Sequence, residues 1–175
     1  MNQLYLSPIL LWNLMEHLKI VTKITVCSYE ELHSEEKKMI EAAKEAAKKA
    51  YAPYSNFQVG AAVFLENTTI VTGNNQENVA YPSGLCAERT AVFYANAQYP
   101  EQSVQMLAVT AFSNGDFTEM PITPCGACRQ VLLETENWFG KPIQLLLYGT
   151  KKIYKIGSVK ELLPLCFGEE LPSFL

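Results

Sequence analysis

The chain has 175 residues, which is long enough for one domain with a substantial apolar core and too short for two domains of ordinary size. Apolar residues make up 49% and charged residues 18%, a composition typical of globular proteins. The net charge of −4 argues against a nucleic-acid partner, because polyanion binding needs a basic face. A small-molecule substrate is the better hypothesis.

The cysteine count and the N-terminal segment bear on the cellular compartment. Five cysteines, an odd number, do not fit a framework of disulfides and indicate a reducing environment. The apolar residues 4–14 follow no basic residues, include Pro8, and are too few to span a bilayer. We therefore predict a cytoplasmic protein without a membrane partner. Met15 is an alternative candidate for the true start, which would make residues 1–14 an incorrectly assigned leader.

The first part of the chain predicts an extension followed by a helix. Residues 19–29 alternate and are rich in β-branched side chains, which indicates a short strand. We assign residues 1–33 to an N-terminal extension and residues 34–175 to the main domain. Ser34 is the predicted N-cap of a helix with a narrow apolar face, and Pro53 ends this helix.

The rest of the chain alternates strands and helices. The predicted strands cover residues 57–65, 69–73, 104–112, 143–148 and 152–156. The predicted helices cover residues 86–98 and 125–136, and a short last helix begins at Ser158 and stops at Pro164. A turn is expected at residues 113–116. This order predicts an α/β fold, a three-layer α/β/α sandwich around one mixed five-stranded sheet.

Two cysteine motifs carry the strongest chemical signal. Cys86-Ala87-Glu88 is followed, 39 positions after Cys86, by Cys125-Gly126-Ala127-Cys128. A structural zinc site fills all four tetrahedral positions with protein atoms, whereas a catalytic site leaves one position for water. Three thiolates with a nearby glutamate favour the open kind of site. The same constellation is known from enzymes that modify nucleobases, in which the glutamate acts as general acid and base.

Two other interpretations of the motifs are weaker. A redox pair of Cys125 and Cys128 would leave Cys86 and Glu88 without a role. A structural zinc site would need a fourth ligand. The candidates for that ligand are Cys27, Cys166, His17 and His33, none of which lies at knuckle spacing from Cys86. The catalytic interpretation uses every element of both motifs.

The predicted helices explain how these residues would work together. The cysteines lie at helix N-termini, whose positive dipole end stabilises thiolates. Arg89 could offset the excess negative charge of three thiolates by hydrogen bonding to the sulfur atoms. Glu88 would move a proton from water to the substrate ring nitrogen and then to the leaving amine. Without the motif, Arg89 and Glu88 would be ordinary exposed side chains of a helix.

These residues resemble the cytidine deaminase family, in its homotetrameric single-domain type. The matching stretches are residues 51–62, 75–81, 86–91 and 124–130, and the similarity runs from about Ser34 to the C-terminus. The resemblance implies a cytidine deaminase-like fold and the hydrolytic deamination of cytidine and 2′-deoxycytidine in pyrimidine salvage, with release of ammonia. It also implies one zinc ion per chain bound by Cys86, Cys125 and Cys128, with Glu88 as the proton shuttle.

The resemblance further assigns residues that bind the substrate. Asn75 and Glu77 match a pair that hydrogen-bonds the ribose 3′-hydroxyl and leaves the 2′ position unread. Phe57 matches an aromatic side chain that packs beside the nucleoside, and Ala87 is a further substrate-binding residue. Taken alone, Asn75 and Glu77 would be loop residues and Phe57 a core residue.

Two aromatic residues are expected to act between subunits. Phe167 resembles a C-terminal phenylalanine that reaches a neighbouring subunit's pocket, and Tyr81 is expected to act across the same interface. The resemblance thus implies a homotetramer with shared active sites. The chain departs from the family in its long leader before Ser34. Two rival functions stay open: a deaminase for another aminopyrimidine compound, and a non-enzymatic module in which zinc only holds two helices together.

Overall fold

The computed structural model describes residues 18–167, and the alternative start Met15 and the candidate ligand His17 lie outside this range. The strands are β1 (Thr25–Cys27), β2 (Gln58–Leu65), β3 (Ile70–Asn74), β4 (Val104–Ser113), β5 (Asp116–Phe117), β6 (Gln144–Tyr148) and β7 (Ile153–Ile156). The helices are α2 (Ser34–Ala47), α3 (Ala87–Gln98) and α4 (Gly126–Phe139), with short 3₁₀ helices η1 (Tyr81–Ser83) and η2 (Val159–Leu162). Across residues 18–167, none of the helices has the length and apolar character needed to cross a lipid bilayer.

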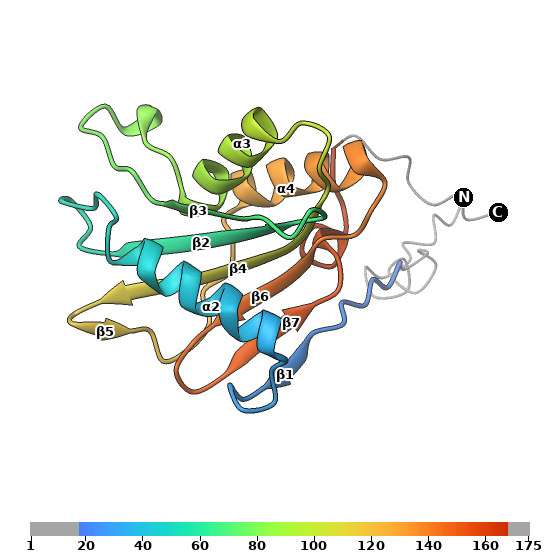
Figure 1. Ribbon diagram of the computed structural model, residues 1–175, viewed down its shortest axis with the longest axis horizontal. Coiled ribbons are helices and arrows are strands. Elements are labelled where there is room, and N and C mark those ends of the chain that lie inside the picture. Colours follow the sequence, from blue (N-terminus) through green and yellow to red (C-terminus); the bar gives the residue numbers. More distant parts are fainter. Residues whose placement is uncertain (1–17, 168–175) are drawn as a thin grey trace, which may run out of the picture.

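All strands belong to one mixed sheet in the order β1-β7-β6-β4-β2-β3, with β5 paired to β4 (Figure 1). The pair β4 and β6 is parallel, and every other pair is antiparallel. The predicted fold class is therefore confirmed, and the five predicted strands are all present. Within residues 18–167 the sheet has seven strands, however, because two short strands extend it.

The two additional strands have different origins. β1 comes from the N-terminal segment predicted to contain a strand, and it pairs with β7 at the sheet edge. β5 follows the predicted turn, where Asn114 (φ 55°) and Gly115 (φ 86°) adopt the positive φ angles of a tight hairpin. This turn brings Asp116 and Phe117 back onto β4, so the turn belongs to a hairpin rather than to a loop.

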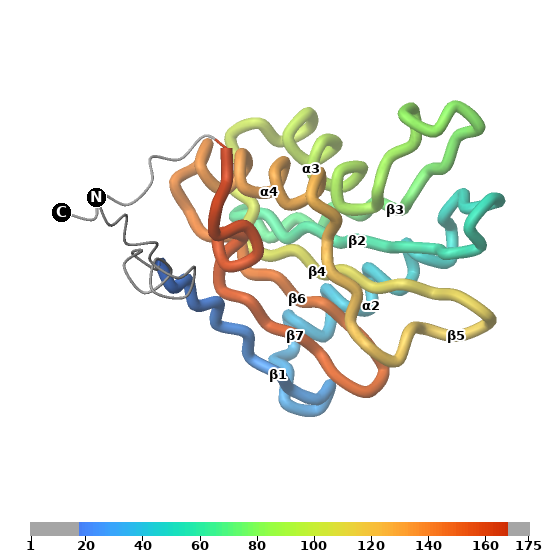
Figure 2. The backbone as a smooth tube through the Cα atoms, turned by 180° about the vertical axis from the view of Figure 1, so that it is seen from behind, coloured from blue at the N-terminus to red at the C-terminus, as the bar shows by residue number. Residues whose placement is uncertain are grey.

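Helices cover both faces of the sheet (Figure 1). On the α2 face, Met39 and Ile40 of α2 pack with Leu146 of β6. On the α3/α4 face, Val92 of α3 and Leu132 of α4 join the other apolar cluster. Figure 2, seen from behind, shows the last described segment, after η2, running beside α4. These are the three layers that the sequence predicts.

Two glycines allow the backbones of two helices to pack directly against the backbone of the sheet. A Cβ atom on Gly60 of β2 would lie 2.0 Å from the carbonyl oxygen of Ala43 in α2. A Cβ atom on Gly73 of β3 would lie 2.4 Å from the backbone nitrogen of Ala91 in α3. No side chain fits at either position without moving its helix. Gly73 therefore fixes the height of α3 above the sheet.

The start of α2 differs by one residue from the prediction. His33, not Ser34, occupies the N-cap position, and its backbone N–H donates to the Glu36 carboxylate at 2.9 Å. This contact satisfies an N–H at the helix start, so Ser34 can be the first helical residue. At the other end of the chain, Ser158 caps η2 as predicted, since its hydroxyl oxygen accepts the N–H of Lys160.

Candidate functional site

Three cysteine side chains converge between the N-termini of α3 and α4. Cys86 is the N-cap residue of α3, Cys125 is the N-cap residue of α4, and Cys128 lies in the first turn of α4. The Sγ atoms of Cys86 and Cys125 are 3.8 Å apart, and those of Cys125 and Cys128 are 3.4 Å apart. Sulfur atoms bound tetrahedrally to zinc at about 2.3 Å would be separated by about 3.8 Å. The three thiols therefore fit a zinc ion.

Among the described residues, the cluster consists of Cys86, Cys125 and Cys128. Within the described range, residues 18–167, no further His, Cys, Asp or Glu offers a ligand atom to it. Three of the candidates for a fourth ligand, Cys27, Cys166 and His33, thus lie elsewhere in the fold, and His17 is outside the described range. The described residues fill three tetrahedral positions, which is the pattern of a catalytic rather than a structural zinc site.

The surroundings of the cluster favour thiolates. Neither N-cap cysteine side chain accepts a hydrogen bond from the N–H groups of its helix, but each lies at the positive dipole end of that helix. The Arg89 guanidinium lies 3.8 Å from the Cys86 sulfur. Hydrogen bonds from the Cys128 thiol and from Arg89 lower the pKa of the Cys86 thiol, although burial acts in the opposite direction. The predicted contact between Arg89 and a ligand sulfur is present.

Glu88 lies beside the thiols and is buried. It belongs to the first turn of α3, and only 4% of its surface is exposed. Burial raises the pKa of Glu88 to about 7, and the negative charge of Cys86 acts in the same direction. A solvated glutamate that only favours the helix dipole would be exposed, so this alternative is wrong. A carboxyl group with such a pKa can both accept and give up a proton near neutral pH.

A cavity of about 830 Å³ opens in front of the cluster. Its lining includes six residues for which the sequence predicts a functional role: Cys86, Cys125, Arg89, Asn75, Glu77 and Tyr81. Its lining also includes residues without a predicted role, among them Tyr54, Ser55, Val79 and Leu85. Tyr54 and Ser55 lie within the stretch 51–62 that carries the family resemblance. Their place in this stretch is the sequence feature that could have indicated a role at the site.

Other predicted site residues do not line this cavity. Cys128, Glu88, Ala87 and Phe57 are absent from its wall, and Ala87 is fully buried in the apolar cluster of the α3/α4 face. Phe167 is 89% exposed, and its backbone oxygen accepts a hydrogen bond from Gln130 at 3.2 Å. The structure therefore brings the thiols, Arg89 and the Asn75–Glu77 segment together, and it leaves the Phe167 side chain outside.

Asn75 and Glu77 both hold the neighbouring loop. The Asn75 side chain accepts the N–H of Val59 at 2.7 Å and donates to the carbonyl of Phe57 at 2.9 Å. Glu77 accepts the N–H of Tyr54 at 2.9 Å. Both side chains thus have a structural role in addition to any contact with a ligand.

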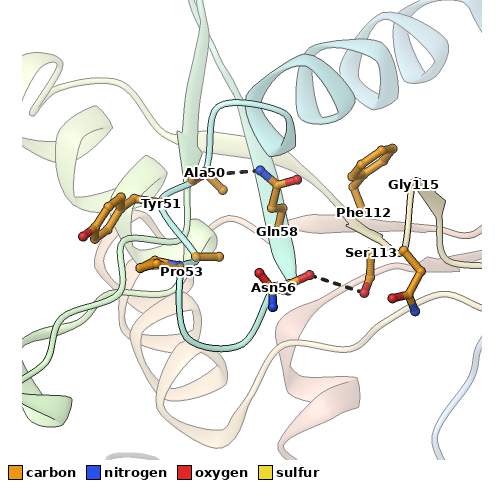
Figure 3. A pocket seen from close by; sticks show the side chains of 10 residues that line it. Ala50, Tyr51, Pro53, Asn56, Gln58, Phe112, Ser113 and Gly115 are labelled. Atoms are coloured by element: carbon orange, nitrogen blue, oxygen red, sulfur yellow. Dashed lines mark hydrogen bonds between the residues drawn. The ribbon is translucent and has the colours of Figure 1, made fainter.

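A second cavity of about 440 Å³ lies between residues 50–58 and the hairpin of β4 and β5 (Figure 3). Gln58 donates to the carbonyl of Ala50 across it, and Ser113 donates to the carbonyl of Asn56. Its lining contains no acidic, basic, histidine or cysteine side chain. Of these two cavities, the one at the thiols is therefore the one with ionisable side chains in its wall.

Comparison with known proteins decides the family. Residues 33–138 match the model of the cytidine and deoxycytidylate deaminase zinc-binding region, and this span contains all three clustered cysteines and Glu88. The chain belongs to the cytidine and deoxycytidylate deaminase family. Zinc is thus the metal of the family, and the three thiols provide a matching donor set for one ion per chain.

Individual members of this family are similar over most of their length. The cytidine deaminase of Sporosarcina psychrophila is 42% identical over 137 residues, which cover 78% of this chain and 94% of the relative. That of Mycobacterium tuberculosis H37Rv is 38% identical over 131 residues, 74% of this chain and 88% of the relative. The crystal structure of the Burkholderia pseudomallei cytidine deaminase matches with a TM-score of 0.63 at 42% identity, covering 74% of this chain and 97% of that one.

Proposed function

We propose that this protein is a zinc-dependent hydrolase that deaminates cytidine and 2′-deoxycytidine to uridine and 2′-deoxyuridine, with release of ammonia. The observation that carries this proposal is a cluster of three thiols beside the buried Glu88, without a fourth ligand among residues 18–167. The names of the relatives at 42% and 38% identity agree with it. We assign the reaction to a catalytic domain of residues 34–175, and we treat residues 1–33 as an extension.

The proposed roles follow from the positions of the side chains. Cys86, Cys125 and Cys128 would hold the zinc ion, which supplies a Lewis acid that lowers the pKa of water. Glu88 would take a proton from the attacking water and give it to the ring nitrogen of the base. The same carboxylate would then take the second proton of that water, from the hydroxyl group now bound to the ring carbon, and give it to the amino group. The bond between the ring carbon and this nitrogen breaks and ammonia leaves, so one residue moves both protons. Arg89 would offset part of the negative charge of the thiolates.

Substrate recognition is assigned to the loops around the cavity. Asn75 and Glu77 would hydrogen-bond the 3′-hydroxyl, so that the 2′ position stays unread and both ribo- and deoxyribonucleosides react. Phe57 would pack beside the nucleoside and Ala87 would contact the base after local adjustment, because neither lines the cavity in this arrangement. Sugar contacts provide binding energy that orients the base, so free cytosine should be a poor substrate.

We also propose a homotetramer with active sites shared between subunits. The support is the exposure of two aromatic side chains that a stable monomer would be expected to cover: Tyr81 is 93% exposed and Phe167 is 89% exposed. Tyr81 also lines the cavity, so a neighbouring chain that packs on it would reach the site. Cysteine usage and the absence of disulfides among the described residues agree with a cytoplasmic role in pyrimidine salvage.

A substrate panel tests the proposal. Cytidine, 2′-deoxycytidine, cytosine and a pyrimidine nucleotide would be followed by ultraviolet absorbance, with zinc measured on the same sample. We expect turnover of both nucleosides and little turnover of cytosine. Preference for another aminopyrimidine compound would favour the rival deaminase, and zinc without any turnover would favour the non-enzymatic module. Activity that persists after dilution to monomers would contradict the shared sites.

A further inference from the structure

One serine connects two of the residues assigned to the substrate. The Ser55 hydroxyl donates to Oε1 of Glu77 at 2.5 Å, and its oxygen accepts the backbone N–H of Phe57 at 3.0 Å. Ser55 lines the cavity in front of the thiols, next to Tyr54. Its side chain therefore joins the Glu77 carboxylate to the backbone of Phe57.

Glu77 is held from more than one direction. Its second oxygen, Oε2, accepts the backbone N–H groups of Tyr54 at 2.9 Å and of Ser55 at 3.3 Å. The hydrogen bonds from the Ser55 hydroxyl and the Tyr54 N–H lower the pKa of Glu77, so the carboxylate stays ionised at neutral pH. A carboxylate has roughly four acceptor sites. Three are used within the protein, which leaves room for one ligand donor.

Asn75 is constrained in the same way. Its Oδ1 accepts the N–H of Val59, and one N–H of its amide donates to the carbonyl of Phe57. The second amide N–H stays available for a ligand. A hydroxyl group that donates to Glu77 and accepts from Asn75 would satisfy both side chains, provided that both are held at fixed positions.

We propose that Ser55 is a positioning residue for sugar recognition, whose hydroxyl fixes the Glu77 carboxylate and the Phe57 backbone as one preorganised unit. This inference rests on the proposed function. Ser55 acts through Glu77, because a side chain that is already hydrogen-bonded in the right place loses less entropy when the ligand arrives. Without the hydroxyl, Glu77 keeps the two backbone N–H groups on Oε2 and can turn about them.

The test combines Ser55→Ala with a pair of substrates that differ by one hydroxyl. Steady-state rates would be measured with cytidine and with 3′-deoxycytidine, which lacks the group that Glu77 would bind. Loss of a charge-assisted hydrogen bond predicts a fall of about tenfold in kcat/KM for cytidine, mainly through KM. The loss with 3′-deoxycytidine should be much smaller. Ser55→Thr, which keeps the hydroxyl, should restore the preference for cytidine.

Ser113→Ala is the matched control. Ser113 lines the second cavity and donates to the carbonyl of Asn56 at 3.4 Å, so it contacts the same loop as Ser55 (Figure 3). It makes no contact with Glu77, so its truncation should leave the ratio of the two substrates unchanged. Ser55 is exposed in the loop and Ser113 is half-buried at the end of β4, so truncation of either leaves no fully buried cavity.

The outcomes separate this inference from the proposed function. A wild-type protein that does not deaminate cytidine would contradict the proposed function itself. A wild-type protein that does, combined with equal losses of Ser55→Ala on both substrates or no loss on either, would overturn only the role of Ser55. Additive effects of Ser55→Ala and Glu77→Gln in the double variant would overturn it as well, because residues that act through one another are not additive.

Discussion

The two faces of the sheet use helix N-termini in different ways. On the α2 face, the start of α2 is satisfied from within, because the Glu36 carboxylate accepts the N–H of His33. On the α3/α4 face, the N-cap residues of both helices are cysteines, and neither helix has a side-chain cap. The positive dipole ends of α3 and α4 thus lie at thiols, whereas the start of α2 is closed by a carboxylate of its own first turn.

The close packing of helix on sheet is common to both faces. The backbone of α2 lies against Gly60 and that of α3 lies against Gly73, each so close that a methyl group on the glycine would not fit. On the α2 face this contact serves only the apolar core, whereas on the α3/α4 face it also positions Cys86 and Glu88, which begin α3. We therefore expect equivalent substitutions on the two faces to reduce stability in both cases. Only those on the α3/α4 face should also affect zinc binding or activity.

The largest expected effect is that of removing a ligand. Cys128→Ala should reduce the zinc content and the deaminase activity to near background, because two thiols hold zinc poorly. The matched control is Cys27→Ala, since Cys27 packs against the cluster of the α2 face. That variant should keep its zinc. Equal zinc content in both variants, measured by atomic absorption, would contradict the assignment of the cluster.

The next effect concerns Glu88. Glu88→Ala should retain zinc, since Glu88 is not a ligand, and should lose about 10²–10⁴-fold in kcat because the proton shuttle is missing. Rates and metal content would be measured on one preparation. A rate close to that of the wild type would refute the proton-transfer role.

A smaller loss is expected for Arg89→Ala. The guanidinium lies 3.8 Å from the Cys86 sulfur, and groups that support metal ligands in this way typically contribute about 10–100-fold to metal affinity or activity. Competition with a zinc chelator would measure the affinity. If neither the affinity nor kcat/KM changed, Arg89 would be only a surface residue of α3.

The smallest effects come from the two glycines. Gly60→Ala and Gly73→Ala should each reduce the free energy of unfolding by about 1–3 kcal/mol, because the added methyl group overlaps a helix backbone. Only Gly73→Ala should also lower kcat, since it displaces the start of α3. Thermal unfolding and kinetics would be compared at a temperature where both variants are folded. An equal loss of kcat in the two variants would contradict the expectation that only the packing on the α3/α4 face positions the site.

The sequence predicted those features that depend on local patterns. The five main strands and three helices follow from alternation and helical spacing, and the cysteine ligands follow from two short motifs. β5 was not predicted because two residues are too few to show alternation, and the N-cap of α2 moved by one residue because Glu36 reaches back to His33.

The site features that were not predicted depend on contacts between distant residues. Ser55 and Glu77 are 22 positions apart, and only the packing of the loop after α2 against the segment after β3 brings them together. The burial of Glu88 likewise depends on how Gly73 admits α3, which the cysteine motif does not contain. The zinc ligands could thus be read from the sequence, whereas the support of the substrate residues required the fold.

Zinc-edge X-ray absorption spectroscopy of the purified protein shows directly whether the zinc ion has an open position. We predict one zinc per chain with three sulfur atoms at about 2.3 Å and a single oxygen at about 2.0 Å, contributed by water. A change in the oxygen shell on addition of a nucleoside would agree with an open position. A fourth sulfur, a protein nitrogen in its place, or a protein that is fully folded and active without zinc would contradict the account.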